Sequence, residues 1–254
     1  MISIFERRDG LVVSGADAGK YLHSQLSNEI ASLGRGESTY AFALDPNGKV
    51  VALCRVLRVD EHEFLIDVDR GAGEALLARL LRFRIRVDVT IETRELGVWC
   101  VRGDVSEVSG AGSPTSGAIR ASAWWSDGTA IDFIEPLDND VSSRPEDAAG
   151  ELEKLRVRAR WPRHGAEIVT GETLPAATGV VPIAVSFTKG CYPGQELVER
   201  MDSRGATAPF VLRDIDVSGY APGDPYIVDG VEVGRVTSVA GGRALAYVRR
   251  DLAQ

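Results

Sequence analysis

The chain has 254 residues, of which 44% are hydrophobic and 26% are charged, a composition typical of a folded, water-soluble protein. The net charge of −8 argues against a broad nucleic-acid-binding surface, which needs a basic field, and leaves only a local basic patch open. Three widely spaced cysteines and three histidines suit neither a disulfide framework nor a closed zinc site, so we expect no metal centre.

The sequence also bears on location. No apolar run approaches the roughly 20 residues of a membrane span. The first five residues are followed at once by Glu6-Arg7-Arg8-Asp9, which is not the pattern of a signal peptide. Unpaired cysteines fit a reducing compartment. We therefore expect a cytoplasmic protein that does not contact a membrane.

The first hundred residues alternate between strand and helix patterns. Strands are predicted over residues 11–13, 39–44, 50–59, 63–68, 87–91 and 98–101. The first helix starts between residues 14 and 17 and ends near Gly34, with an apolar stripe of Tyr21, Leu22, Leu26, Ile30 and Leu33. A second helix is predicted over residues 71–83, and Asp45-Pro46-Asn47-Gly48 predicts a hairpin turn. This order favours an α+β lobe over an antiparallel sheet, residues 1–103.

The rest of the chain is predicted to form two further units, residues 104–205 and 206–254. In the first of them, a Ser-, Gly- and Pro-rich loop over 104–123 is followed by a hairpin with Trp124-Trp125 and a strand over 129–134. A polar loop over 138–144 then leads to a helix over 145–157. The last unit has strands over 210–217, 226–228, 231–233 with its continuation over 234–238, and 244–248, with Asp229-Gly230 as a hairpin turn.

Residues 189–196 read Lys-Gly-Cys-Tyr-Pro-Gly-Gln-Glu and place a thiol, an ammonium, a carboxamide and a carboxylate within eight residues. We predict a strand over 183–187, a tight turn, and a helix that starts near Pro193, because proline suits the first helical position. Cys191 then precedes a helix N-terminus, and Lys189 adds a positive charge. Both effects lower the pKa of a thiol from about 8.5. The other interpretation makes Cys191 a small buried apolar residue in a turn.

The stretch from Ser186 to Glu196 resembles the motif of the YgfZ family, folate-binding proteins related to the aminomethyltransferase (T-protein) of the glycine cleavage system. Residues 14–22, 45–49 and 233–238 resemble other segments of this superfamily, in its order. The resemblance implies an aminomethyltransferase-like α+β fold with antiparallel sheets and a small C-terminal β-barrel. It also implies tetrahydrofolate or a derivative as ligand. The implied role is assembly or repair of iron–sulfur clusters in client enzymes, with an indirect effect on tRNA modification.

Two departures from the relatives bear on function. The aminomethyltransferases carry an acidic pair after the hairpin turn, where this chain has Val51 and Ala52, and neither side chain accepts a proton. This disfavours the alternative function, tetrahydrofolate-dependent aminomethyl or methyl transfer, and favours an accessory factor over a classical enzyme. A glutamate that grips the pterin in those enzymes is replaced by Arg158, and a nearby glycine by Arg160. The four arginines between residues 156 and 163 either bind an anion, such as the folate glutamate tail or an acidic partner, or form a solvated face.

These considerations give a set of predicted site residues. Cys191 and Lys189 are the predicted chemical pair, in which Lys189 favours the thiolate. The predicted folate-binding residues are Tyr192, Gln195, Glu196, Arg158 and Arg200. Gln195 and Glu196 alternatively serve only the start of the helix.

The predicted partners are iron–sulfur client enzymes or assembly proteins. A cluster at Cys191 is expected to be transient or shared, because stable clusters usually take four ligands. A plain folate-binding or interaction module, in which Cys191 is structural, is the third interpretation.

Overall fold

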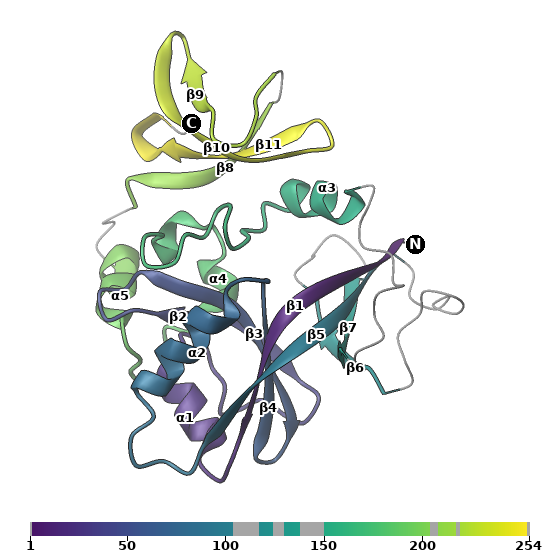
Figure 1. The fold of residues 1–254 in the computed structure, drawn as a ribbon. Coiled ribbons are helices and arrows are strands. Elements are labelled where there is room, and N and C mark those ends of the chain that lie inside the picture. Colours follow the sequence, from purple (N-terminus) through teal and green to yellow (C-terminus); the bar gives the residue numbers. More distant parts are fainter. Residues whose placement is uncertain are drawn as a thin grey trace.

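A computed structural model shows the fold (Figure 1) and describes residues 2–103, 117–123, 130–137, 150–203, 208–216 and 219–252. The larger of its two sheets has seven strands in the order β2-β3-β4-β1-β5-β7-β6, and all neighbours are antiparallel. The strands are β1 (Ile2–Ser14), β2 (Ser38–Leu44), β3 (Val50–Asp60), β4 (Glu63–Val68), β5 (Thr90–Arg102), β6 (Ile119–Ser122) and β7 (Ala130–Pro136). The long strand β1 therefore lies at the centre of this sheet.

Two helices, α1 (Ala18–Gln25) and α2 (Gly73–Arg82), pack on one face of the large sheet. Leu11 and Val13 of β1 are fully buried in the apolar cluster on this face. Val12, between them, packs into a second cluster that contains Leu152. Successive side chains of a strand point to opposite faces, so the apolar run in β1 supplies both layers of the core.

The middle segment of the chain, residues 150–203, crosses one end of the large sheet. It contains α3 (Glu151–Arg158), the 3₁₀ turn η2 (Pro175–Ala177), α4 (Val181–Ala184) and α5 (Gln195–Ser203). A third apolar cluster joins this segment to strands β2 and β3. Within it the rings of Tyr40 and Trp161 meet edge to face, with their centroids 4.9 Å apart.

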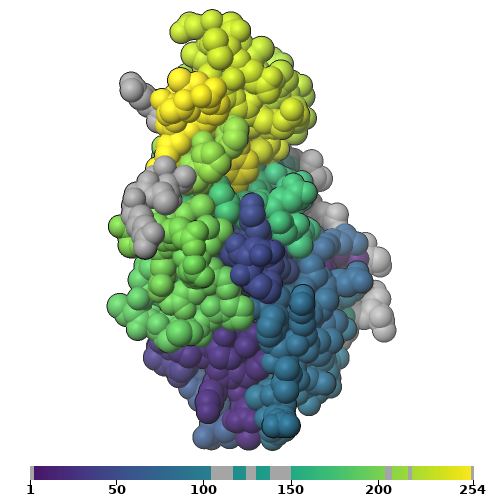
Figure 2. All heavy atoms as spheres, turned by 90° about the vertical axis from the view of Figure 1, so that its left-hand side faces the viewer, coloured from purple at the N-terminus to yellow at the C-terminus, as the bar shows by residue number. Residues whose placement is uncertain are grey.

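The last part of the chain forms a four-stranded antiparallel sheet in the order β8-β11-β10-β9. Its elements are β8 (Phe210–Asp216), β9 (Pro225–Val228), β10 (Val231–Ala240), β11 (Arg243–Arg249) and the 3₁₀ turn η3 (Arg250–Leu252). Figure 2 shows this unit (yellow) stacked on the middle segment (green), which lies on the N-terminal part (purple and blue).

Glu167 fixes the C-terminal sheet to the middle segment. Its carboxylate is fully buried and accepts hydrogen bonds from the hydroxyls of Thr237 (2.7 Å) and Ser238 (2.6 Å). Arg156 donates to the same carboxylate over 2.8 Å, and the Tyr247 hydroxyl donates to the Glu167 carbonyl oxygen over 2.8 Å. A buried carboxylate is stable only when it is paired and hydrogen-bonded. Here Arg156 of the middle segment supplies the ion pair, and Thr237 and Ser238 of the C-terminal sheet supply hydrogen bonds.

Most of the predicted strands are present. The strand over 63–68 is confirmed without change, the hairpin at 45–48 joins β2 to β3, and the second helix is α2. Asp229 and Gly230 both have positive φ angles, 51° and 79°, as a two-residue hairpin turn requires. The predicted boundary after residue 103 falls between strands of one sheet, and the division into three units stays a prediction.

Four predicted elements differ from the structure. The first helix ends at Gln25 instead of Gly34, because residue 26 forms a bridge to Ala43. The two strands over 87–91 and 98–101 are one strand, β5, which pairs with β1 along its whole length. The strand over 183–187 is absent, since α4 occupies 181–184 with a proline in its first turn.

Several other predictions fall on residues that the structure does not describe. The tryptophan pair at 124–125 and the polar loop over 138–144 lie outside the described residues, as do most of the Ser-, Gly- and Pro-rich loop and the first five residues of the helix over 145–157. Within the described part, no helix combines the length and apolar character needed to cross a membrane.

Candidate functional site

The motif loop, residues 185–194, joins α4 to α5 and carries Cys191. Cys191 is exposed, whereas Cys54 and Cys100 are buried in strands of the large sheet. Burial raises the pKa of the Cys54 thiol to about 12 and that of Cys100 well above its ordinary value. The interpretation of Cys191 as a buried apolar residue is therefore wrong, and it is the thiol that solvent reaches.

Lys189 holds the motif loop against the end of α1. Its Nζ donates hydrogen bonds to the carbonyl oxygens of His23 and of Leu26, the second over 2.7 Å. Carbonyls at a helix C-terminus lack partners within the helix and carry partial negative charge, so they favour a cation. The ammonium also lies 4.8 Å from the centre of the Tyr192 ring. Lys189 thus positions the loop two residues before Cys191.

The environment of Lys189 changes its acidity. Burial lowers the pKa of Lys189 from 10.5 to about 8, and the charges of Glu29 and Cys191 oppose this effect only in part. The pKa of His23 is also lowered, first by burial and then by the charge of Lys189. Lys189 and Cys191 therefore interact electrostatically across the loop.

Ser27 and Asn28 fix the start of the motif loop. The Ser27 hydroxyl donates to the carbonyl oxygen of Ala184 over 2.6 Å, and the Ser27 carbonyl accepts a hydrogen bond from the Ser186 N–H over 3.0 Å. Asn28 Nδ2 donates to the carbonyl oxygen of Ile183 over 2.9 Å. The helical pattern predicted for residues 14–34 includes Ser27 and Asn28 and gives no sign of this role, because their partners lie more than 150 residues away along the chain.

The other side of the motif packs on the first hairpin turn. Gly194 has a φ of 85° and Gly48 a φ of 82°, both in the region that favours glycine. A Cβ atom on Gly194 would lie 2.6 Å from the carbonyl oxygen of Asp45, and one on Gly48 would lie 2.6 Å from the Cβ of Leu197. The motif loop and the hairpin turn at 45–48, which both resemble the same family, therefore lie in contact. Each can pack this closely only because the other has a glycine at the contact.

The four predicted ligand residues that follow Cys191 have local partners. Tyr192 is buried in the apolar cluster against β2 and β3, and burial raises its pKa to about 12. Gln195 Oε1 accepts a hydrogen bond from the Tyr192 N–H over 3.2 Å, and its Nε2 donates to Glu199. Arg200 and Glu196 form an exposed ion pair of 2.5 Å along α5. These contacts favour the interpretation that Gln195 and Glu196 serve the helix.

Arg158 lies elsewhere. It is exposed at the last position of α3, whereas the motif loop precedes α5. The arginines between 156 and 163 do not form a uniform solvated face. Arg156 is buried and pairs with Glu153 and Glu167 over 2.7 and 2.8 Å, and Arg163 pairs with Glu153 over 2.8 Å. Part of this cluster therefore holds the middle segment together.

A chain of buried charges crosses the large sheet, and sequence analysis did not detect it. Arg55 pairs with Asp67 over 2.6 Å and with Asp132 over 2.7 Å, and all three are almost completely buried. Arg102 reaches the other oxygen of Asp132 over 2.7 Å, and Arg8 reaches Asp67 over 2.9 Å. Arg55, Asp67 and Asp132 each have apolar neighbours on both sides in their strands, and this is the signal that points to buried pairing.

An enclosed cavity beside this charge chain is too small for a pterin. It is lined by Tyr40, Leu53, Arg55 and Trp161 among others, and its volume is about 10 Å³. A space of this size holds one water molecule at most. Val51 and Ala52, which replace the acidic pair of the aminomethyltransferases, are buried apolar residues of β3. The core of the large sheet in this structure therefore offers no space of pterin size among the described residues.

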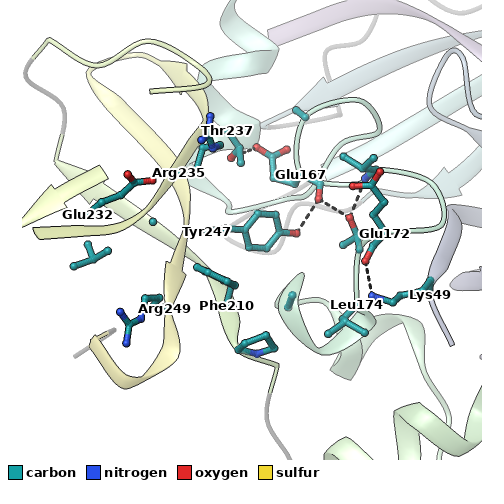
Figure 3. A pocket seen from close by; sticks show the side chains of 17 residues that line it. Lys49, Glu167, Glu172, Leu174, Phe210, Glu232, Arg235, Thr237, Tyr247 and Arg249 are labelled. Atoms are coloured by element: carbon teal, nitrogen blue, oxygen red, sulfur yellow. Dashed lines mark hydrogen bonds between the residues drawn. The ribbon is translucent and has the colours of Figure 1, made fainter. Parts of the chain in front are cut away.

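A larger cavity lies between the middle segment and the C-terminal sheet (Figure 3). Its volume is about 760 Å³. One wall comes from residues 166–177, with Leu174, and the other from β8, β10 and β11, with Phe210 and Tyr247. Lys49, next to the Gly48 turn, reaches its edge and donates to the carbonyl oxygen of Glu172 over 3.0 Å. None of the predicted site residues lines this cavity.

Among the described residues, no group of three or more His, Cys, Asp or Glu side chains is placed to hold a metal ion. A cluster at Cys191 would therefore need ligands from outside these residues. The geometry of the motif loop is that of a single accessible thiol on a firmly anchored backbone.

Comparison with known proteins places this geometry in a family. Residues 208–254 match the family described as CAF17, C-terminal beta-barrel domain. The iron–sulfur cluster assembly factor IBA57, mitochondrial, of Homo sapiens is 30% identical over 271 residues, which cover 95% of this chain and 76% of that protein. The tRNA-modifying protein YgfZ of Enterobacter sp. is 29% identical over 214 residues, which cover 76% of this chain and 65% of that protein.

The fold is shared with the glycine cleavage system aminomethyltransferase T from Bartonella henselae. Its crystal structure has a TM-score of 0.75 with this chain at 16% identity, covering 97% of this chain and 78% of that one. The aminomethyltransferase-like α+β fold and the C-terminal barrel domain predicted from the sequence are thus confirmed. Because a relative is 30% identical over 95% of this chain, the chain belongs to the family that contains YgfZ and IBA57.

Proposed function

We propose that this protein is an accessory factor for the assembly or repair of iron–sulfur clusters in client enzymes, and that it acts through Cys191. The observation that carries the proposal is the exposed Cys191 on a loop fixed by Lys189 before it and by Gly194 after it. The names of the relatives, an iron–sulfur cluster assembly factor and a tRNA-modifying protein, support this role. An effect on tRNA modification then follows indirectly, through a client enzyme.

The cluster is cargo in this proposal. A single thiolate supplies one of the usual four ligands of a cluster, so assembly proteins or client enzymes supply the rest. An anchored loop lowers the entropy lost when a partner binds, because the thiol is already in place. Lys189 contributes its position and its positive charge close to the thiol. A cytoplasmic location stays a prediction.

A folate ligand belongs to the proposal by family resemblance. Tyr192, Gln195, Glu196, Arg158 and Arg200 stay predicted ligand residues, although the local contacts of the four near Cys191 give them structural tasks as well. Aminomethyl transfer is disfavoured, because the buried Val51 and Ala52 offer no base.

The test is a complementation experiment in a bacterium that lacks its own YgfZ relative. We expect the wild-type chain to restore the activity of an iron–sulfur client enzyme, and Cys191→Ala to fail while folding normally. Thr188→Ala, an exposed residue of the same loop, is the matched control and should behave as wild type. Full activity of Cys191→Ala would exclude a chemical role of the thiol and leave a plain binding module.

A further inference from the structure

We propose that the cavity between the middle segment and the C-terminal sheet is a binding site for a flat, mostly apolar small molecule that carries an anionic group. The cavity volume of about 760 Å³ lies within the range of small-molecule sites, about 300–1,000 Å³, which occur preferentially at domain interfaces. The enclosed cavity of about 10 Å³ in the large sheet offers no comparable space.

Hydrogen bonds within the protein hold the wall of the cavity in place without a ligand. Tyr247 extends from β11 to the loop of residues 166–173, where its hydroxyl bonds the Glu167 carbonyl oxygen over 2.8 Å (Figure 3). The same loop is closed on itself, since the Val169 N–H donates to Thr173 Oγ1 over 2.9 Å. The Thr237 hydroxyl holds the Glu167 carboxylate from the other unit. A ligand would therefore meet a pre-formed surface and lose little affinity to ordering of the protein.

Apolar and aromatic groups make up much of the lining. Phe210 keeps 43% of its surface exposed although it is a large apolar residue, and it faces this cavity together with Tyr247. The remaining apolar lining residues are Ala166, Val169, Leu174, Ala177, Pro209 and Val233. Aromatic rings at an open apolar surface suit a flat ligand, which gains both burial and ring contacts.

The charges of the lining nearly balance. The lining includes three cations, Lys49, Arg235 and Arg249, against three carboxylates. Glu167 is buried and paired with Arg156, and Arg249 pairs with Asp251 outside the lining, so the N–H donors of the cations, and not a net charge, favour an anionic group. In Figure 3 Arg249 and Lys49 lie on opposite sides of Phe210.

The cations also keep donors for a ligand. Arg249 pairs with Asp251 over 2.7 Å, yet a guanidinium has five N–H donors and only some are used. Arg235 likewise uses Nη1 for the Gly223 carbonyl oxygen, over 2.9 Å. Carboxylate or sulfonate groups take such donors in pairs.

A folate has this chemistry: a flat ring system joined to a carboxylate-bearing tail. Only the identification of the ligand with a folate rests on the proposed function; the class of ligand follows from the cavity itself. The folate would then bind beside the C-terminal sheet, away from the predicted residues of the motif.

The test uses two probes and matched variants. The aromatic sulfonate 8-anilinonaphthalene-1-sulfonate and 5-formyltetrahydrofolate are each titrated into the full-length chain by calorimetry. We expect Phe210→Ala and Arg249→Gln each to weaken binding of both probes by about tenfold, which corresponds to about 1.4 kcal/mol. Phe187→Ala and Arg94→Gln are controls, since Phe187 is 42% exposed and the Arg94 side chain is 55% exposed, against 48% for Arg249.

The outcomes distinguish the proposed binding site from the identification of its ligand as a folate. Failure of the sulfonate to bind the wild-type chain, or binding that neither Phe210→Ala nor Arg249→Gln weakens relative to the controls, would overturn the proposed site. Sulfonate binding that depends on these residues, without binding of the folate, would support the site and remove folate from the proposed function. A thermal unfolding curve like that of the wild type confirms that each variant is folded.

Discussion

Gly194 and Gly48 lie back to back: a Cβ atom on Gly194 would come 3.0 Å from the Cα of Gly48. One glycine belongs to the loop that carries Cys191 and the other to the hairpin between β2 and β3. The position of the thiol therefore depends on a turn 146 residues earlier in the chain, and neither glycine tolerates a side chain without movement of backbone atoms.

The first prediction concerns this contact. Gly194→Ala should lower the free energy of unfolding by about 1–3 kcal/mol, because it adds backbone strain at a φ of 85° to a clash with the Asp45 carbonyl oxygen at 2.6 Å. Gly190→Ala, in the same loop, is the control, since a Cβ there meets nothing within 4 Å. Urea unfolding measures both variants. Equal stability of the two would contradict the contact.

The elements that the sequence predicted correctly depend on local pattern. The strand over 63–68 is a short, mostly apolar segment. The turn at 45–48 holds its own shape, because Asp45 Oδ1 accepts hydrogen bonds from the N–H groups of Asn47 and Lys49 over 2.8 and 2.9 Å. Such features depend only on residues that are neighbours in the sequence, so they can be predicted from the local sequence.

The elements that were predicted wrongly depend on contacts between residues far apart in the sequence. The apolar spacing of Leu26, Ile30 and Leu33 looks helical, and all three are buried, but Ser27 and Asn28 bond to residues near α4 instead of continuing the helix. Tertiary contacts override local propensity there. Likewise, the sequence identifies Cys191 and Lys189 as a pair but cannot show that the Lys189 ammonium is bonded to carbonyls at the end of α1.

The second prediction follows from those bonds. Lys189→Met should lower the free energy of unfolding by about 1–3 kcal/mol, because two carbonyl oxygens at the end of α1 lose a charged donor. Lys20→Met, an exposed residue on α1 itself, is the control and should change stability little. Urea unfolding at pH 7 compares the two. A Lys189→Met protein as stable as the control would show that the clamp contributes nothing.

The third prediction is the pH dependence of the Lys189 contribution. Burial lowers the pKa of Lys189 to about 8 from 10.5, so between these values the unfolded chain binds more protons than the folded one. Stability then rises with pH across this window. The difference in unfolding free energy between wild type and Lys189→Met should therefore grow from pH 7.5 to 9.5. A constant difference would contradict the lowered pKa.

The fourth prediction concerns the reactivity of Cys191. Iodoacetamide should label one thiol in the folded protein, that of Cys191, because Cys191 is exposed whereas Cys54 and Cys100 are buried. Cys191→Ala should react slowly until it is unfolded, since Cys54 and Cys100 are buried. A folded wild-type protein that iodoacetamide does not label would leave the motif with a structural role only.

The fifth prediction tests the buried charge chain. Burial alone would raise the pKa of Asp132, but Arg55 and Arg102 together hold it below its ordinary value. Asp132→Asn removes the negative charge that pairs with these two buried guanidinium groups. It should lower the free energy of unfolding by about 3–5 kcal/mol. Asp214→Asn, which breaks the more exposed pair with Arg243, should cost about 1 kcal/mol or less.

The same carboxylate should give the folded protein part of its acid sensitivity. A pKa lowered by folding contributes stability above the ordinary value of 3.8, and this contribution is lost as the pH falls through the lower, folded value. The wild type should therefore lose stability more steeply than Asp132→Asn as the pH falls below about 4. Urea unfolding from pH 6 to 3 measures both slopes. Parallel curves for the two proteins would mean that Asp132 is not held ionised by its arginine neighbours.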